Sequence, residues 1–200
     1  MERMEADWEF EAGGDAPVID ACWPGLVDLR RAPERAWNLP ETAHCPALAE
    51  ALAKLNAAAS PVWTSKCDFW PHLGASEFDP DELDAPPGSS AHSIGCYIDL
   101  LPRSGQQWLP PERAADWCKR LCGLLRALPL RCCRADLVIR RAVITPDPAD
   151  PEQIELGITA YLTSCGASPA QAARTLADAL ASFADALFAL LTVEWKNTGE

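Results

Sequence analysis

Basic side chains are scarce in this sequence. It has 17 lysines and arginines against 29 aspartates and glutamates, which gives a formal net charge of -12. The basic residues form only short groups, such as Arg30-Arg31 and Arg140-Arg141. Proteins that bind nucleic acid or anionic membranes present a concentrated basic surface that neutralises phosphates. The composition therefore argues against nucleic acid and membranes as partners.

Long apolar runs and export signals are also missing. The first residues, MERMEAD, have neither the basic start nor the apolar core of a signal peptide. The most apolar stretch, 179–193, is interrupted by Ser182 and Asp185 and falls short of the ~20 apolar residues that span a bilayer. These features predict a soluble, cytoplasmic protein whose thiols are reduced.

No motif for a common nucleotide or metal chemistry occurs. The chain lacks GxGxxG, a phosphate-binding GK[ST], GxSxG, HExxH and, among its nine cysteines, any CxxC pair. Cys118 and Cys122 share one helix face by their spacing, but two thiols are at most half of a metal site, and free cysteines usually fill core gaps. His44, His72 and His92 have no spacing that selects a cysteine as a nucleophile partner. We therefore predict no metal and no cofactor.

Hydrophobic periodicity gives the order strand, strand, helix three times. Alternation of apolar residues marks the strands, and apolar residues three and four apart mark the helices. The last helix has the clearest start, because Ser168-Pro169-Ala170-Gln171 is a capping-box pattern with proline at the first helical position. The expected strands cover 8–10, 17–23, 61–70, 93–101, 133–144 and 154–164, and the expected helices cover 46–56, 110–128 and 168–191.

Two segments carry turn or loop signals. Gly13-Gly14-Asp15 lies between the first two expected strands and predicts a hairpin. Segment 71–92 is rich in proline and has five acidic residues with no lysine or arginine. Loops this long are uncommon inside compact domains and are either functional covers or mobile excursions. We expect a single domain over residues 1–200, with 71–92 as an acidic, proline-rich excursion.

The order of elements predicts an α+β fold. Counted from the second strand, it matches a ferredoxin-like arrangement with an extension, in which helices cover one face of an antiparallel sheet of about five or six strands. The short, proline-rich connection 145–151 suits antiparallel neighbours. A doubly wound parallel sheet is the weaker alternative.

One face of the expected sheet collects polar side chains. If the helices cover the face that carries Cys67, Ile98 and Leu137, alternation places Thr64 and many charged and tyrosine side chains on the other face. That face is either a solvated surface with cross-strand ion pairs or the wall of a small-molecule pocket. The predicted ligand-binding residues on it are Lys66, Asp68, Tyr97, Asp99, Arg140 and Tyr161.

Tryptophan is abundant, with eight residues in the chain. Trp23, Trp37, Trp70 and Trp108 fall in loops or near the ends of elements, where indoles either anchor loops to the core or line an interface or an apolar pocket. Loop anchoring is the more common role of buried aromatics.

The last helix and the acidic surface together suggest a function class. Between residues 170 and 191 only Arg174, Asp178 and Asp185 are charged, too few for a helix with a wide solvent-facing side, so we expect an oligomer interface there. The leading hypothesis is a non-catalytic module that binds a protein partner or assembles with itself. The alternative is a small-molecule-binding protein or enzyme with its site on the polar sheet face.

Overall fold

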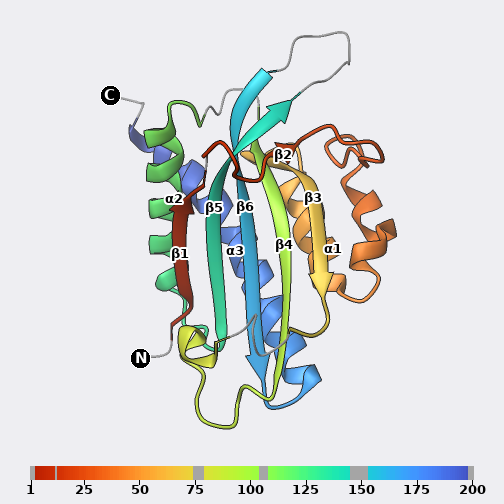
Figure 1. Cartoon of the computed structure of the whole chain (residues 1–200), viewed down its shortest axis with the longest axis vertical. Helices are drawn as coiled ribbons and strands as arrows, with labels where there is room; N and C mark the ends of the chain where they lie inside the picture. The colour runs from red at the N-terminus through yellow and green to blue at the C-terminus, as the bar shows by residue number, and fades with distance from the viewer. Residues whose placement is uncertain (1–2, 12, 74–78, 104–107, 145–152, 198–200) are drawn as a thin grey trace.

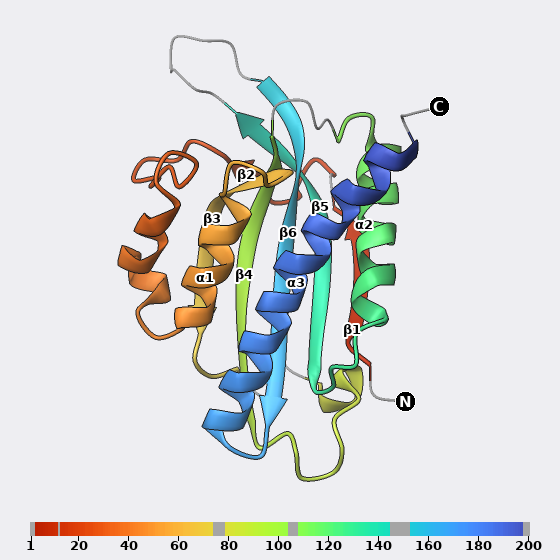
Figure 2. The same cartoon turned by 180° about the vertical axis from the view of Figure 1, so that it is seen from behind.

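The computed structural model describes residues 3–11, 13–73, 79–103, 108–144 and 153–197. They form an α+β fold in which an open sheet of six strands carries the three α-helices on one face (Figures 1 and 2). The strands are β1 (Glu5–Phe10), β2 (Ile19–Asp20), β3 (Val62–Trp70), β4 (His92–Pro102), β5 (Cys133–Ile144) and β6 (Gln153–Gly166); the helices are α1 (Pro46–Leu55), α2 (Pro111–Arg126) and α3 (Pro169–Asn197), with short 3-10 helices η1 (Pro33–Asn38), η2 (Pro40–Thr42) and η3 (Pro80–Leu83).

The sheet is mixed. Its main order is β1-β5-β6-β4-β3, and β3, β4, β6 and β5 are successive antiparallel neighbours, while β1 and β2 both pair with β5 in parallel. The predicted antiparallel pairing of 133–144 with 154–164 is confirmed. A ferredoxin-like arrangement is not confirmed, because the sheet is mixed. The predicted α+β class stands.

The predicted N-terminal hairpin is wrong. A turn does form at the glycines, where the Ala16 N–H donates to the Gly13 carbonyl at 3.1 Å. The two strands beside this turn nevertheless pair with β5 and not with each other, since Glu5 lies opposite Arg134 and Ile19 lies opposite Ala142. β5 is longer than β1 and β2, so its open edge offers each of them a longer pairing partner than they would offer each other.

The three predicted helices are confirmed, and α3 is the central one. Ser168 Oγ accepts from the Gln171 N–H at 3.3 Å and Gln171 Oε1 accepts from the Ala167 N–H at 3.2 Å, which caps the first turn reciprocally. The helix lies across the sheet between α1 and α2 (Figure 2). Leu180 and Phe183 are fully buried in the main core. Leu176, Leu180, Phe183, Leu187 and Leu190 of α3 are therefore buried within the chain, and these side chains are no longer an argument for an oligomer interface.

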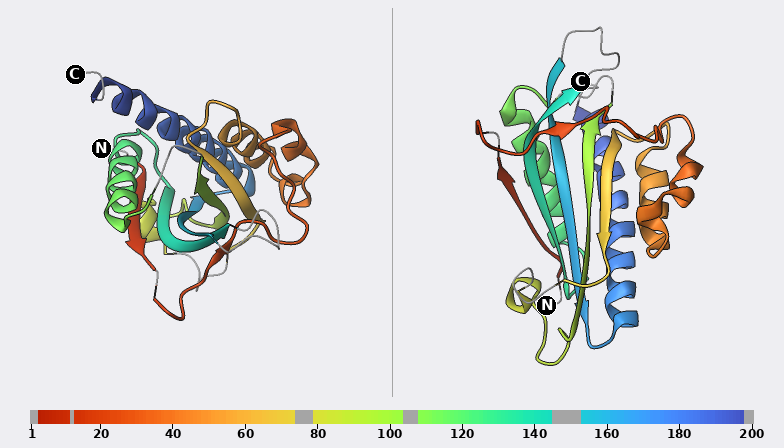
Figure 3. Two further views of the ribbon diagram at one scale, coloured as in Figure 1. Left: turned by 90° about the horizontal axis from the view of Figure 1, so that it is seen from above. Right: turned by 45° about the vertical axis from the view of Figure 1, so that its right-hand side comes forward.

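Residues 19–30, which we call the strap, cross the open face, meaning the sheet face opposite the α-helices (Figures 1 and 3). Ile19 starts the strap beside β5 and packs in a small second core with Trp63 of β3. Gly157 of β6 leaves room for this crossing, because a Cβ there would lie 2.6 Å from Ile19 Cδ1. At the far end, the Arg30 guanidinium stacks 4.0 Å from the Trp63 ring. The strap thus closes one end of the open face.

The acidic segment 71–92 is anchored where the structure describes it; residues 74–78 lie outside the described part. Asp79 caps η3 by accepting from the Asp81 N–H, and Leu83 is buried against Cys132 and Cys165 at the end of the sheet. Trp108 is likewise buried against Trp117 of α2, with ring centroids 5.1 Å apart. This contact fits the loop-anchoring interpretation of the tryptophans.

All nine cysteines are free thiols, and only Cys22 and Cys67 are partly exposed. Cys118 and Cys122 of α2 pack in the main core, as expected of cysteines that fill small gaps. Within the described ranges, no three His, Cys, Asp or Glu side chains gather in a way that could hold a metal ion. None of the helices in those ranges has the length and apolar character needed to cross a membrane.

Candidate functional site

A β-bulge in the edge strand β3 shapes the site. Thr64 pairs with Leu100 and Cys67 pairs with Ile98, so three steps along β3 match two along β4. The extra residue reverses the alternation of side chains at this point. Thr64 consequently faces the helices, and the prediction that it lies on the open face is wrong, because simple alternation cannot anticipate a bulge.

Thr64 is held in place by a buried asparagine at the end of α1. Asn56 Nδ2 donates to Thr64 Oγ1 at 2.7 Å and to the Leu52 carbonyl at 2.8 Å, while the Thr64 N–H donates to Asn56 Oδ1 at 3.1 Å. Asn56 is completely buried, so these bonds satisfy polar groups that have no access to water. They fix the strand to α1 just where the bulge begins.

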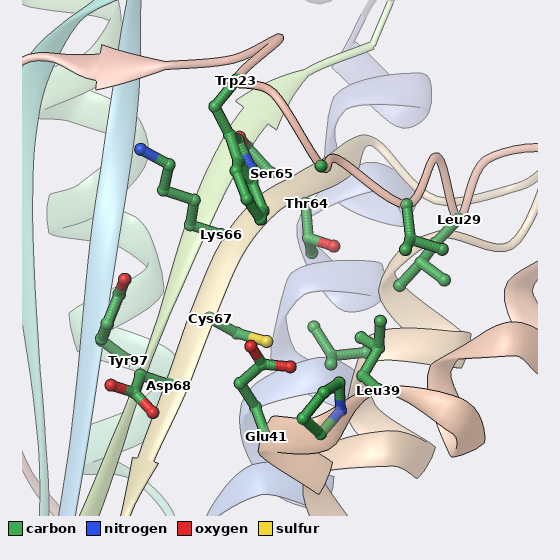
Figure 4. Close-up of a pocket in the computed structure, with 14 residues that line it drawn as sticks. Trp23, Leu29, Leu39, Glu41, Thr64, Ser65, Lys66, Cys67, Asp68 and Tyr97 are labelled. Carbon is green, nitrogen blue, oxygen red and sulfur yellow. The ribbon is translucent and has the colours of Figure 1, made fainter.

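Beside the bulge lies a pocket of about 570 Å³, which we call the edge pocket (Figure 4). It is enclosed by β3, the strap, η2 and α1, and it takes apolar walls from the last three. Trp23 of the strap forms one rim and packs against Gly25, whose φ of +101° and lack of a Cβ allow the close approach. The other lining residues are Val27, Leu29, Leu39, Pro40, Glu41, Leu52, Thr64, Ser65, Lys66, Cys67, Asp68 and Tyr97.

Glu41 places a carboxylate in this largely apolar pocket. Its side chain points toward Cys67 and the cavity (Figure 4), and it makes no ion pair or hydrogen bond with any residue that the structure describes. The short helix η2 presents it rigidly, because Pro40 begins the turn and the buried Thr42 hydroxyl donates to the Ala36 carbonyl at 2.8 Å. The carboxylate of Glu41 thus has no partner among the described residues.

Lys66 is the opposite charge at the pocket, but it does not neutralise Glu41. Its ammonium lies 5.5 Å from the centroid of the Trp23 ring, a cation–π contact, and the described residues include no carboxylate in ion-pair contact with it. The side chain extends on the other side of β3 from Glu41 (Figure 4). The two charges therefore face different parts of the site.

Cys67 lies between these charges and stays protonated. Burial is the main cause that raises the pKa of its thiol to about 12, and the negative charges of Glu41 and Asp68 act in the same direction. Because the thiolate is the nucleophilic form of cysteine, this thiol is a poor nucleophile at physiological pH.

Alkylation should reveal this protonation directly. We expect iodoacetamide at pH 8 to modify Cys67 about a thousandfold more slowly than a free cysteine peptide, since a pKa of about 12 against 9.0 lowers the thiolate fraction by that factor. Peptide mass spectrometry of timed samples gives the rate. Modification of Cys67 as fast as the free peptide would show that the thiolate is accessible and stabilised.

The open face carries a second group of polar residues, centred on Arg140. Its guanidinium donates to Glu11 Oε2 at 2.7 and 3.0 Å and, through Nη1, to Thr159 Oγ1 and Tyr161 Oη at 3.2 Å. The Thr159 hydroxyl donates in turn to Asp99 Oδ1 at 2.6 Å. Burial raises the pKa of Asp99, while the bond from Thr159 and the charge of Arg140 lower it in part. These residues form one connected network across three strands.

Three aromatic rings continue from this network toward the sheet edge. Trp70 and Tyr97 have ring centroids 5.7 Å apart, Tyr97 and Tyr161 are 6.0 Å apart, and the Arg140 guanidinium lies 5.8 Å from the Tyr161 centroid. Trp70 and Tyr161 also line a second, more open hollow of about 480 Å³ over β5 and β6. Tyr97 therefore stands between the edge pocket and this hollow.

The six residues predicted to bind a ligand share the open face but do not form one site. Lys66, Asp68 and Tyr97 line the edge pocket, and Arg140 and Tyr161 line the second hollow. Asp99 lies buried within the network and lines neither. Their role in binding stays a prediction.

No sequence pattern pointed to Glu41 or to the strap side of the edge pocket. In the sequence, residues 30–45 are a polar, proline-punctuated segment, and no local pattern shows that a glutamate after Pro40 meets the strand that begins at Val62. The geometry of the site carries the functional argument alone, because no protein-family model, no curated protein and no solved structure matches this chain.

Proposed function

We propose that the protein binds a small amphipathic molecule in the edge pocket and performs no covalent chemistry on it. The observation that carries this proposal is a pocket with apolar walls in which the charged groups of Glu41 and Lys66 have no ion-pair partner among the described residues. A volume of about 570 Å³ falls in the usual range for small-molecule sites, which combine apolar walls with a few polar groups that orient the ligand.

The chemistry of the side chains favours binding over catalysis. The thiol of Cys67, a potential nucleophile in the pocket, is held in its unreactive protonated form. On the open face, Arg140 and Asp99 are committed to hydrogen bonds with protein groups. Charged side chains that are hydrogen-bonded to protein groups in this way stabilise a sheet face and are poorly placed to act on a substrate.

A protein partner or a second copy of the chain is the alternative proposal. Its main support is Trp37 of η1, which is 51% exposed, since exposed tryptophans are enriched at the centres of protein interfaces. The other large exposed apolar side chains include Phe10 and Ile154, which lie on different strands. Because the leucines of α3 between Leu176 and Leu190 are buried inside the chain, this alternative has less support than the pocket.

A pocket-filling variant tests the proposal. Val27→Trp should occupy the edge pocket and abolish the binding of molecules found by a ¹⁹F NMR screen of a fragment library, because the indole fills space that a ligand needs. Val18→Trp makes the same change at an exposed position just before the strap and should leave binding intact. Equal thermal melting of the two variants would show that both are folded.

Two results would contradict a binding function for the edge pocket. One is unchanged fragment binding in Val27→Trp. The other is a set of fragments whose chemical-shift changes map to the second hollow, around Trp70 and Tyr161, and not to Thr64–Asp68.

A further inference from the structure

We propose that the ligand of the edge pocket is an amine with an apolar body, and that Glu41 is the counter-ion of its ammonium group. This inference rests on the proposed binding function and names the chemical class that the pocket selects. It starts from the charge balance of the pocket lining, where Glu41 and Asp68 are negative and Lys66 alone is positive.

These three charges lie in different parts of the pocket, so the negative charge in its apolar part is not balanced there. Asp68 is exposed on the open face and accepts a hydrogen bond from its own neighbour, the Phe69 N–H, at 2.8 Å. Lys66 extends toward Trp23 on the other side of β3 (Figure 4). Glu41 is therefore the charge inside the apolar part of the pocket, where an anionic ligand would be repelled and a neutral one would leave it unpaired.

A second polar group lines the pocket further along β3. Thr64 is 4% exposed, and its hydroxyl accepts from Asn56 Nδ2, which leaves one lone pair and the hydroxyl proton without a partner among the described residues. Figure 4 shows this hydroxyl directed into the cavity. This lone pair offers the ligand a hydrogen-bond acceptor at this point of the pocket.

The rest of the pocket suits an alkyl or aryl body. Leu39, just before η2, and Leu52 of α1 approach from the helix side, and Val27 and Leu29 approach from the strap. These walls bury apolar surface of the ligand, which adds to the affinity that the charge contact gives. The arrangement therefore selects for charge and for an apolar tail together.

Three probes with the same phenyl ring and four-carbon chain test the assignment: 4-phenylbutylamine, 4-phenylbutanol and 4-phenylbutanoate. Titration followed by ¹H–¹⁵N NMR should show that the amine binds at Thr64–Asp68 at least about tenfold more tightly than the alcohol, and that the carboxylate is weakest. Glu41→Gln should remove the preference for the amine and leave the affinity for the alcohol unchanged. Glu50→Gln removes the same charge from an exposed position on α1 and should retain the preference.

The outcomes separate the two proposals. Equal affinities for the amine and the alcohol, or equal losses in the Glu41 and Glu50 variants, would overturn the amine assignment while the pocket still binds small molecules. Absence of shifts at the pocket with all three probes would overturn the binding function as well. A near-native ¹H–¹⁵N spectrum of Glu41→Gln is required for either result to count.

Discussion

Leu180→Ala is expected to lower the free energy of unfolding by about 2 to 5 kcal/mol. Leu180 is fully buried on α3, which packs on the sheet between α1 and α2. Removing its three terminal carbons takes apolar area out of the core and leaves a cavity that the surrounding helices can close only in part. Urea unfolding followed by circular dichroism measures the loss.

The control for this change is Leu109→Ala, the same deletion at a leucine that is 39% exposed. It should change the stability by no more than about 0.5 kcal/mol, the usual scatter at surface positions. Equal effects of the two substitutions would mean that α3 is not packed in the core as the structure has it.

The success with α3 shows what periodicity can predict. Its start at Ser168-Pro169 and its stripe of leucines depend only on residues within a few turns of one another, so local sequence determines them. The same holds for α1, α2 and the four long strands, all of which lie where alternation or helical spacing places them. Elements whose stabilising contacts are local or strongly periodic can be predicted in this way.

The pairing of strands was predicted less well, and the errors have a common physical cause. The glycine turn at Gly13 suggests that its two flanking strands pair, whereas β1 and β2 each gain a longer partner in β5. The orientation of Thr64 was wrong because one extra residue in the bulge reverses the faces of β3. In both cases a contact distant in sequence decides the outcome.

The candidate site combines both kinds of information. Lys66 and Asp68 share the open face with Tyr97, as spacing along two strands predicts. Glu41 and the strap reach the same pocket from segments with no periodic pattern, so only the folded chain brings them there. Sequence reasoning therefore predicted the strand side of the pocket and not its opposite wall.

Arg140→Met is expected to destabilise the protein by about 1 to 3 kcal/mol at neutral pH, because the partly exposed Glu11 loses its ion-pair partner and the buried Asp99 loses one of two nearby cations. The Arg140 side chain is only 15% exposed, and it holds Glu11 directly and Asp99 through Thr159. Arg31→Met removes an arginine that is 90% exposed and should cost no more than about 0.5 kcal/mol.

The pH dependence follows from the direction of the shift at Asp99. Burial raises the pKa of this carboxyl in the folded state, so between the unfolded value of 3.8 and the higher folded value the folded protein keeps a proton that the unfolded chain has lost. The free energy of unfolding therefore falls as the pH rises through this window, and the cost is fully present above it. Asp99→Asn removes the cost, so its stability relative to the wild type should increase from pH 4 to pH 7.

The double variant Arg140→Met/Asp99→Asn measures how the effects of these two substitutions depend on each other. Without Arg140 the pKa of Asp99 should rise further, so Arg140→Met should lose less stability at pH 4 than at pH 7. In the Asp99→Asn background the loss at pH 7 should be smaller by about 1 kcal/mol or more, since the charge that most needs Arg140 is gone. Urea unfolding of the four proteins at both pH values gives this coupling energy. Strictly additive effects at pH 7 would show that Arg140 and Asp99 act independently, and that the open face is held by separate exposed contacts.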